Sequence, residues 1–197
     1  MAILVLDSAF KPTVSIIKSN KIVLTKVSEN QNHSDHFMLL IDETLKEAKM
    51  KLEDIETIMF NQGPGSFTGL RVGVSISKGL GFGDDKKFLA FSSFDYVDSK
   101  KEILVPAFSN FVYKKSKNGQ MSCEDINELD KNKNYVTFSD EIFEKLKSKG
   151  FSLQKEASLN YLKIFNMLDK KYLKVNELEP LYLRKSQAEI ERENKKK

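Results

Sequence analysis

The chain has 197 residues, 40% of them hydrophobic, and its 32 basic and 28 acidic side chains leave a net charge of +4. This length and composition suit one sizeable domain or two small lobes with a real core, and so small a charge supports RNA contact only weakly. No apolar run approaches the roughly 20 residues that a membrane helix needs, and no basic region precedes the apolar N-terminus, so a soluble, non-exported protein is expected. The single cysteine, Cys123, excludes an internal disulfide and agrees with a cytoplasmic location.

Three strands are predicted at the start of the chain, at Ile3–Leu6, Thr13–Ile17 and Ile22–Val27, separated by polar turns. They form an antiparallel meander. The first strand is continuously apolar, which predicts burial on both faces. Asp7 follows it directly, where an acidic residue could meet a ligand.

An amphipathic helix is predicted over Ser34–Met50, because its apolar residues recur at spacings of three and four. These residues are Phe37, Leu40, Ile41, Leu45 and Ala48. A strand at Glu56–Asn61, a glycine-rich helix and a strand at Lys87–Phe91 follow. This order of elements describes a mixed sheet with helices packed on its faces.

Seven of the nine glycines lie between Gly63 and Gly83. Gly63-Pro64-Gly65 makes a turn, and Ser66 is placed to cap the helix that follows. Gly69, Gly73 and Ser77 recur every fourth residue, so they form a smooth ridge along that helix, although each interior glycine costs about 1 kcal/mol relative to alanine. Periodicity alone favours packing of this ridge on the protein's own sheet over a protein–protein contact.

The second half repeats the pattern in reduced form. Ile103–Lys115 is predicted to be one long strand or a hairpin, Tyr135–Phe138 a strand, and Asp140–Lys149 and Ser158–Leu173 helices. The lobes are accordingly placed at residues 1–97 and 98–184, followed by a charged tail at residues 185–197.

The spacing of residues excludes several common ligand-binding and catalytic motifs. The glycines do not continue as a phosphate-binding Walker loop or a dinucleotide fingerprint, and Pro64 stands where a hydrolase elbow requires glycine. His33 and His36 begin a helix with Asp35 beside them, but two histidines alone do not make a stable metal site. Asp7 stays open as a nucleotide-site acid, although the second half carries only two glycines for the loops that such a site needs.

The stretch Gly63–Gly73, which reads GPGSFTGLRVG, resembles the signature of the TsaB (YeaZ) family of bacterial tRNA-modification proteins. Three further stretches agree in order: Ile3–Ser8, His33–Asp35 and Pro180–Arg184. The second half resembles the family only through the last of these. It is shorter than usual, and Pro106–Asn110 departs from the family pattern.

The resemblance implies an α/β, two-lobed actin-like (ribonuclease-H-like) fold and a non-catalytic subunit without a cofactor. Such a subunit activates a TsaD-type catalytic partner, together with a TsaE-type ATPase, in forming N6-threonylcarbamoyladenosine beside the anticodon of tRNAs reading codons that begin with A. It also implies that the glycine ridge belongs to the partner face, that this face supports a homodimer in the free protein, and that tRNA contacts occur within the complex. The candidate partner-binding residues are Phe37, Leu40, Ile41, Gly65, Ser66, Thr68, Gly69, Arg71, Val72, Gly73, Ile76, Ser77 and Leu80.

Two rival functions stay open. A vestigial nucleotide-binding regulator would use Asp7, Gly63 and Gly65. A metal-dependent peptidase would require ligands, for which His33 and His36 are the candidate pair.

Overall fold

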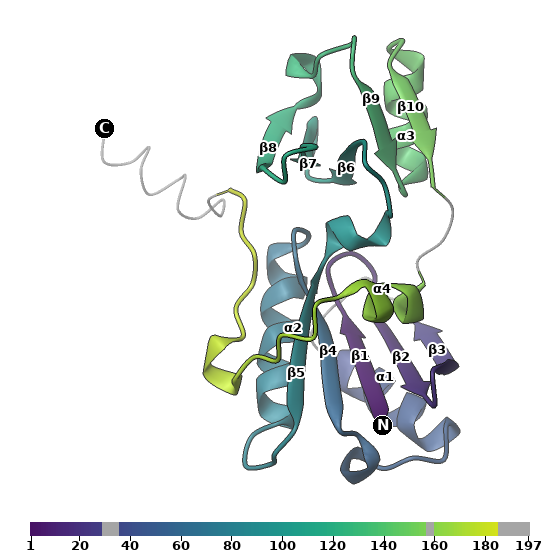
Figure 1. Ribbon diagram of the computed structural model, residues 1–197, viewed down its shortest axis with the longest axis vertical. Coiled ribbons are helices and arrows are strands. Elements are labelled where there is room, and N and C mark those ends of the chain that lie inside the picture. Colours follow the sequence, from purple (N-terminus) through teal and green to yellow (C-terminus); the bar gives the residue numbers. More distant parts are fainter. Residues whose placement is uncertain (29–35, 157–159, 185–197) are drawn as a thin grey trace. The chain divides into compact units, whose positions relative to one another are not determined.

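The computed structural model describes residues 1–28, 36–156 and 160–184, which fall into two compact units (Figure 1). Unit 1 comprises Met1–Tyr96 and Ser158–Pro180, and unit 2 comprises Val97–Ala157 and Leu181–Lys197. The sequence-based division, which placed residues 158–180 in the second lobe, is corrected by this result. The apolar side chains of Tyr161, Ile164 and Phe165 are buried against the first sheet, so this segment returns to unit 1.

Unit 1 contains a five-stranded mixed sheet with the order β3-β2-β1-β4-β5. Its strands are β1 (Ala2–Asp7), β2 (Thr13–Lys18), β3 (Lys21–Val27), β4 (Thr57–Gly63) and β5 (Lys87–Ser92). β2 pairs antiparallel with β1 and β3, whereas β4 lies parallel to β1 and β5. All five strands were predicted from the sequence: four of them are longer than predicted by one or two residues, and β4 begins one residue later and ends two residues later than the predicted Glu56–Asn61.

Both faces of this sheet are covered. Helices α1 (Phe37–Glu47) and α2 (Phe67–Leu80) lie on one face and α4 (Tyr161–Met167) on the other (Figure 1). Leu4 and Leu6 of β1 join the core beneath α1 and α2, and Ile3 and Val5 join the core beneath α4. The burial of β1 on both faces, predicted from its continuous apolar run, is confirmed.

Unit 2 repeats the same plan in a second mixed sheet, with the order β10-β9-β6-β7-β8. Its strands are β6 (Glu102–Pro106), β7 (Phe111–Lys115), β8 (Met121–Asp125), β9 (Asn134–Thr137) and β10 (Ser152–Lys155). Of the two predictions for Ile103–Lys115, the hairpin is confirmed, because β6 and β7 pair antiparallel. β8 and β10 were not predicted, since they are short, largely polar and lie at the edges of the sheet.

The helical cover of unit 2 is smaller. α3 (Asp140–Ser148) packs on a core that includes Leu104, Tyr135 and Leu146. Between β8 and β9, where the matching position of unit 1 holds α1, the chain forms only the 3-10 turn η3 (Ile126–Glu128). The remaining 3-10 turns are η1 (Leu52–Asp54), η2 (Ser93–Tyr96) and η4 (Val175–Glu177).

The predicted helix at residues 158–173 is shorter than expected. α4 ends at Met167, because Leu168 adopts an extended backbone. Farther on, the amide of Leu173 donates to the carbonyl of Phe88 in β5 at 2.9 Å. The chain therefore lies along the β5 edge of the unit 1 sheet instead of continuing the helix. Within the described part of the chain, no helix has the length and apolar character to span a membrane.

Candidate functional site

The carboxyl ends of β1 and β4 bring together Asp7, Asn61, the turn at residues 63–65 and the start of α2. In open α/β sheets this edge is where ligands bind. The three residues predicted for a nucleotide site, Asp7, Gly63 and Gly65, are all in this region. Whether they are available to a ligand depends on what their polar groups already contact.

Asp7 is 3% exposed and accepts four hydrogen bonds from its own chain. Its Oδ1 accepts from the amide of Ala9 at 3.2 Å and from Nδ2 of Asn61 at 3.1 Å. Its Oδ2 accepts from the hydroxyls of Tyr96 and, at 2.8 Å, of Tyr161. A carboxylate has about four lone-pair positions, so the carboxylate of Asp7 is fully used within unit 1.

Burial and these hydrogen bonds act on Asp7 in opposite directions. Burial raises the pKa of its carboxyl group, and the hydrogen bonds from Tyr96, Tyr161, Ala9 and Asn61 lower it, with burial the larger effect. Burial and the neighbouring carboxylate raise the pKa values of Tyr96 and Tyr161 well above their usual range. Both phenols therefore stay protonated hydrogen-bond donors at neutral pH. We call Asp7, Asn61, Tyr96 and Tyr161 the Asp7 cluster.

Sequence reasoning found Asp7 and missed its two tyrosines. Tyr161 lies 154 positions from Asp7 along the chain, and Tyr96 lies 89 positions away. The helix pattern around residue 161 pointed to Leu159, Leu162, Phe165, Met167 and Leu168 as core residues, and of these Met167 is 50% exposed, so that part of the prediction is wrong. No local signal distinguishes a tyrosine that will donate to a distant carboxylate.

The turn at residues 63–65 also packs on its own chain. The amide of Gly63 donates to Oδ1 of Asn61 at 2.8 Å, and its carbonyl accepts from the hydroxyl of Ser92 at 2.9 Å. A Cβ atom on Gly65 would lie 2.5 Å from the carbonyl oxygen of Ala9. The close backbone approach that requires glycine here is therefore made to the segment after β1.

The glycine ridge of α2 faces inward. Gly69, Gly73 and Ser77 are all buried, and the hydroxyl of Ser8 donates to the carbonyl of Gly69 at 2.7 Å. A Cβ atom on Gly73 would lie 2.2 Å from Oγ of Ser8. Of the two interpretations of the ridge, the structure therefore shows packing within the protein.

Five candidate partner-binding residues are corrected by this result. They are buried in the core of unit 1 and cannot touch a partner directly: Phe37, Ile41, Gly69, Gly73 and Ser77. A leucine at position 73 would displace the hydroxyl of Ser8, which a Cβ atom would already approach to 2.2 Å, so Gly73→Leu would disturb the packing of α2 as well as any partner surface.

The other candidates lie at or near the surface. Thr68 and Arg71 are exposed, and the remainder are half-buried: Leu40, Gly65, Ser66, Val72, Ile76 and Leu80. Ser66 caps α2 as predicted, since its Oγ accepts from the amide of Gly69 at 3.2 Å. The guanidinium of Arg71 lies 5.9 Å from the centre of the Phe67 ring.

Two apolar residues that the sequence did not single out lie exposed on α1. Met38 is 47% exposed and Leu39 is 52% exposed. Their signal was present, because both are apolar positions outside the helix's buried stripe. We define the α1–α2 face as Met38, Leu39, Thr68, Arg71, Val72 and Ile76.

The candidate metal ligands are only partly within the described residues. His36 is exposed at the start of α1. The stretch His33–Asp35, which the family resemblance also used, lies outside the described residues. Among the residues that the structure describes, no three His, Cys, Asp or Glu side chains are grouped to hold a metal ion.

Comparison with known sequences connects this architecture to two related groups of proteins. The family described as TsaD, tRNA N6-adenosine threonylcarbamoyltransferase, matches residues 23–101. A TsaB protein of Haemophilus influenzae is 38% identical over 63 residues, which cover 32% of this chain and 27% of that protein. A TsaB protein of Bacillus subtilis is 28% identical over 97 residues, which cover 48% of this chain and 42% of that protein.

A tRNA N6-adenosine threonylcarbamoyltransferase of Kosmotoga olearia is 30% identical over 107 residues, which cover 46% of this chain and 32% of that protein. In each of these three relatives, the matched part spans less than half of the relative's length.

Solved structures share the fold over nearly the whole chain. A Pseudomonas aeruginosa protein described as similar to peptidase YeaZ superposes with a TM-score of 0.72, at 17% identity, over 93% of this chain and 99% of that chain. A structure described as YeaZ from the same organism gives a TM-score of 0.71 at 16% identity. This likeness concerns the fold, and it confirms the two-lobed α/β plan with two mixed sheets. Over part of its length the chain is therefore similar in sequence to TsaB proteins, and it shares its fold with the YeaZ structures.

Proposed function

We propose that the chain is a non-catalytic subunit required for forming N6-threonylcarbamoyladenosine in tRNA. In this proposal it works in the cytoplasm, where it binds and activates a TsaD-type catalytic subunit through the α1–α2 face. A TsaE-type ATPase completes the assembly. The observation that carries the proposal is the sequence likeness to proteins named for threonylcarbamoyladenosine biosynthesis.

The state of the Asp7 cluster supports a non-catalytic role. An acid at the end of the first strand would have to present free oxygen atoms to hold a metal-bound nucleotide. Here both oxygen atoms of Asp7 are occupied by two phenols, one amide side chain and one backbone amide. A nucleotide could enter only by breaking several of these bonds, which disfavours the rival regulator.

The α1–α2 face supports partner binding. Met38 and Leu39 expose apolar side chains on α1, Arg71 is exposed on α2, and apolar residues together with arginine are common anchors of protein interfaces. Residues 23–101, which include both helices, match the TsaD family. Two related folds can pair through equivalent surfaces in a nearly two-fold arrangement, and the same surface then permits a homodimer of the free chain.

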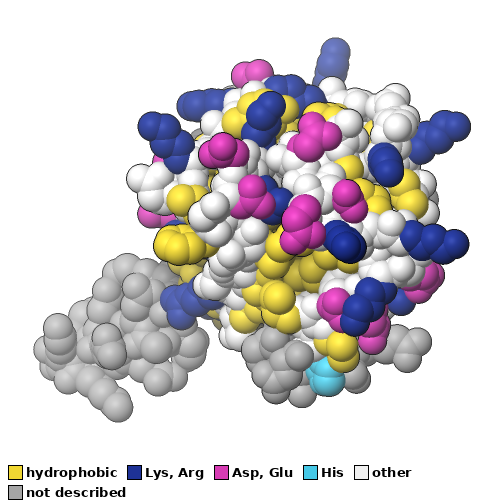
Figure 2. All heavy atoms as spheres, turned by 90° about the horizontal axis from the view of Figure 1, so that it is seen from below, with side chains coloured by type: hydrophobic (Ala, Val, Ile, Leu, Met, Phe, Trp, Pro, Cys, Tyr) yellow, Lys and Arg dark blue, Asp and Glu magenta, His cyan; other side chains and the backbone are white. Residues whose placement is uncertain are grey.

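The distribution of charged side chains does not indicate a nucleic-acid surface. On the face shown in Figure 2, basic and acidic side chains alternate, with hydrophobic patches between them. Mixed charges of this kind do not form the basic stripe typical of a nucleic-acid surface. We therefore assign the principal contact of unit 1 to a protein partner.

Two matched variants test the interface. Leu39→Asp places a carboxylate on the α1–α2 face, and Met167→Asp makes a similar change on α4, which covers the opposite face of the sheet and whose Met167 is 50% exposed. We expect Leu39→Asp to weaken binding to a TsaD-type subunit about tenfold or more in calorimetry, because the charge would lose its water at the interface. Met167→Asp should bind as the wild type does. Equal weakening by both variants, or by neither, would contradict the assignment of this face.

A further inference from the structure

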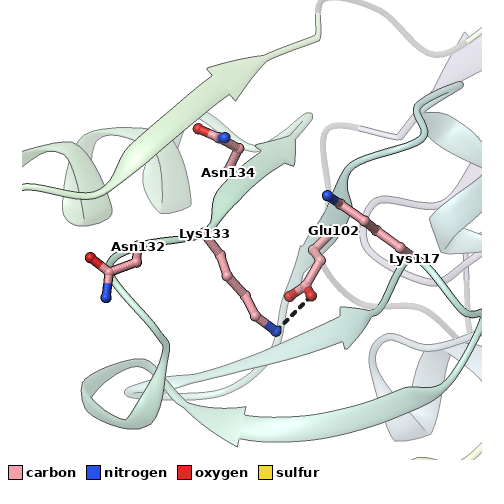
Figure 3. A pocket seen from close by; sticks show the side chains of 5 residues that line it. All are labelled: Glu102, Lys117, Asn132, Lys133 and Asn134. Atoms are coloured by element: carbon pink, nitrogen blue, oxygen red, sulfur yellow. Dashed lines mark hydrogen bonds and ion pairs between the residues drawn. The ribbon is translucent and has the colours of Figure 1, made fainter.

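Unit 2 contains a polar pocket that the proposed function does not use. It has a volume of about 270 Å³ and is lined by Glu102, Lys117, Asn132, Lys133 and Asn134 (Figure 3). These residues come from the start of β6, the turn between β7 and β8, and the segment that leads into β9. Pockets for drug-sized ligands measure roughly 300–1,000 Å³, so this one suits a small polar ligand.

Glu102 is the unusual member of the pocket. Its side chain is 7% exposed, and its Oε1 pairs with the ammonium of Lys133 at 2.8 Å (Figure 3). Its Oε2 is buried without a hydrogen-bond partner. A buried carboxylate oxygen without a donor is costly, so this oxygen favours a ligand that donates a hydrogen bond. Lys133, whose side chain is 45% exposed, can shift to admit the donor.

The charges of the pocket favour an anion as well. Glu102 and Lys133 neutralise each other, which leaves the positive charge of Lys117. Lys117 is exposed on the β7–β8 turn, and Figure 3 shows it reaching over Glu102 from a different segment, apart from the Glu102–Lys133 pair. A ligand that satisfies both halves of the pocket therefore carries an anionic group for Lys117 and a hydroxyl donor for Glu102.

We propose that this pocket binds a ribose phosphate unit of RNA, with the phosphate at Lys117 and a ribose hydroxyl donating to Glu102. The 2′-hydroxyl is the group that allows a protein to distinguish RNA from DNA, and a carboxylate acceptor reads it directly. The inference rests on the proposed role in tRNA modification, which supplies RNA as the source of the sugar phosphate. It places the RNA contact on unit 2 and the protein contact on unit 1.

The test follows the backbone amide NMR signals of the full chain during titration. The probes are an RNA hairpin, a DNA hairpin of the same sequence and adenosine 5′-monophosphate. We expect the RNA hairpin to shift the signals of Lys117 and residues 132–134 and to bind several-fold more tightly than the DNA hairpin. If the free nucleotide binds as tightly as the RNA, the pocket is still a ribose phosphate site, but its ligand is a free nucleotide. Shifts confined to other residues, or equal affinity for RNA and DNA, would overturn the proposal.

Three variants sharpen this test. Lys117→Ala should weaken RNA binding several-fold and reduce its salt dependence, whereas Lys21→Ala, an exposed lysine of unit 1, should leave the shifts in the pocket unchanged. Glu102→Gln should bring the ratio of RNA to DNA affinity close to one. Should Glu102→Gln fold poorly, the exposed Lys117 still decides the matter, because unchanged RNA binding by Lys117→Ala would refute the site. Binding of the TsaD-type subunit is measured separately, so this proposal can fail while the proposed function stands.

Discussion

The two units share one strand order but differ in how their sheets are covered. In unit 1, α1 and α2 cover one face and α4 the other, and every residue of β1 is buried. In unit 2, η3 stands in the place of α1, and all five residues of β8 are half-exposed. The same topology thus yields a sheet whose polar edge is sealed by tyrosines and a sheet that retains an open polar pocket.

The acidic residues show the same contrast. Asp7 has donors for both oxygen atoms, whereas Glu102 has one oxygen atom without a donor. The polar groups at the end of β1 are therefore satisfied within unit 1, whereas the unpartnered oxygen of Glu102 in unit 2 is the basis of the binding site proposed above.

The largest expected effect concerns the close packing of α2, a feature that the glycine-free α3 lacks. Gly73→Leu should destabilise the protein by about 5 kcal/mol or more, because overpacking by a few atoms already costs about 1–3 kcal/mol and this site is 2.2 Å from Ser8 at its first carbon. The matched change Gly79→Ala meets no atom within 4 Å and should stabilise α2 by about 0.5–1 kcal/mol. Urea unfolding measures both. A folded Gly73→Leu protein of normal stability would show that the ridge does not pack on β1.

A second test separates the units. Leu146→Ala removes a fully buried side chain from the core of unit 2 and should cost about 2–5 kcal/mol. Hydrogen exchange should accelerate in β6 and β9 while the amides of β1 keep their protection. Equal acceleration in both sheets would mean that the two units unfold as one.

The Asp7 cluster gives an intermediate effect. Tyr161→Phe removes the hydroxyl that donates to Asp7 at 2.8 Å, which should cost about 1.5–3 kcal/mol because the acceptor is charged. Tyr172→Phe changes a tyrosine that is 39% exposed and should stay within about 0.5 kcal/mol of the wild type. If both variants unfold at the same urea concentration, the hydrogen bond to Asp7 contributes nothing to stability.

The smallest effect is a dependence on pH. Burial raises the pKa of Asp7 in the folded protein above its ordinary value of 3.8, so between these two values the folded state holds more of the proton than the unfolded state. Stability therefore falls as pH rises through this window, by no more than about 1.4 kcal/mol per pH unit. Asp7→Asn should lose this part of the pH profile. If the stability of the wild type instead rises relative to Asp7→Asn across this pH window, the pKa of Asp7 is lowered in the folded protein, and burial is not the dominant effect on its carboxyl group.

The strands of unit 1 and the cap at Ser66 could be predicted because their signals are local: apolar runs, turn residues and a serine before a helix. The direction of the glycine ridge could not, since a period of four residues shows that one face is smooth and does not show what lies against it. The tyrosines of the Asp7 cluster could not be predicted, because they donate to a carboxylate 89 and 154 positions away. The edge strands β8 and β10 were missed because they are short and largely polar. The family resemblance correctly indicated the fold, but it placed five core residues on a partner surface.

The most direct measurement of the central claim is reconstitution of threonylcarbamoyladenosine formation in tRNA. Purified TsaD-type and TsaE-type subunits would be combined with the enzyme that supplies the activated threonylcarbamoyl group, with and without this chain. The account predicts product only when the chain is present, and a corresponding loss with Leu39→Asp but not with Met167→Asp. Equal product formation in the absence of the chain would contradict the proposed function.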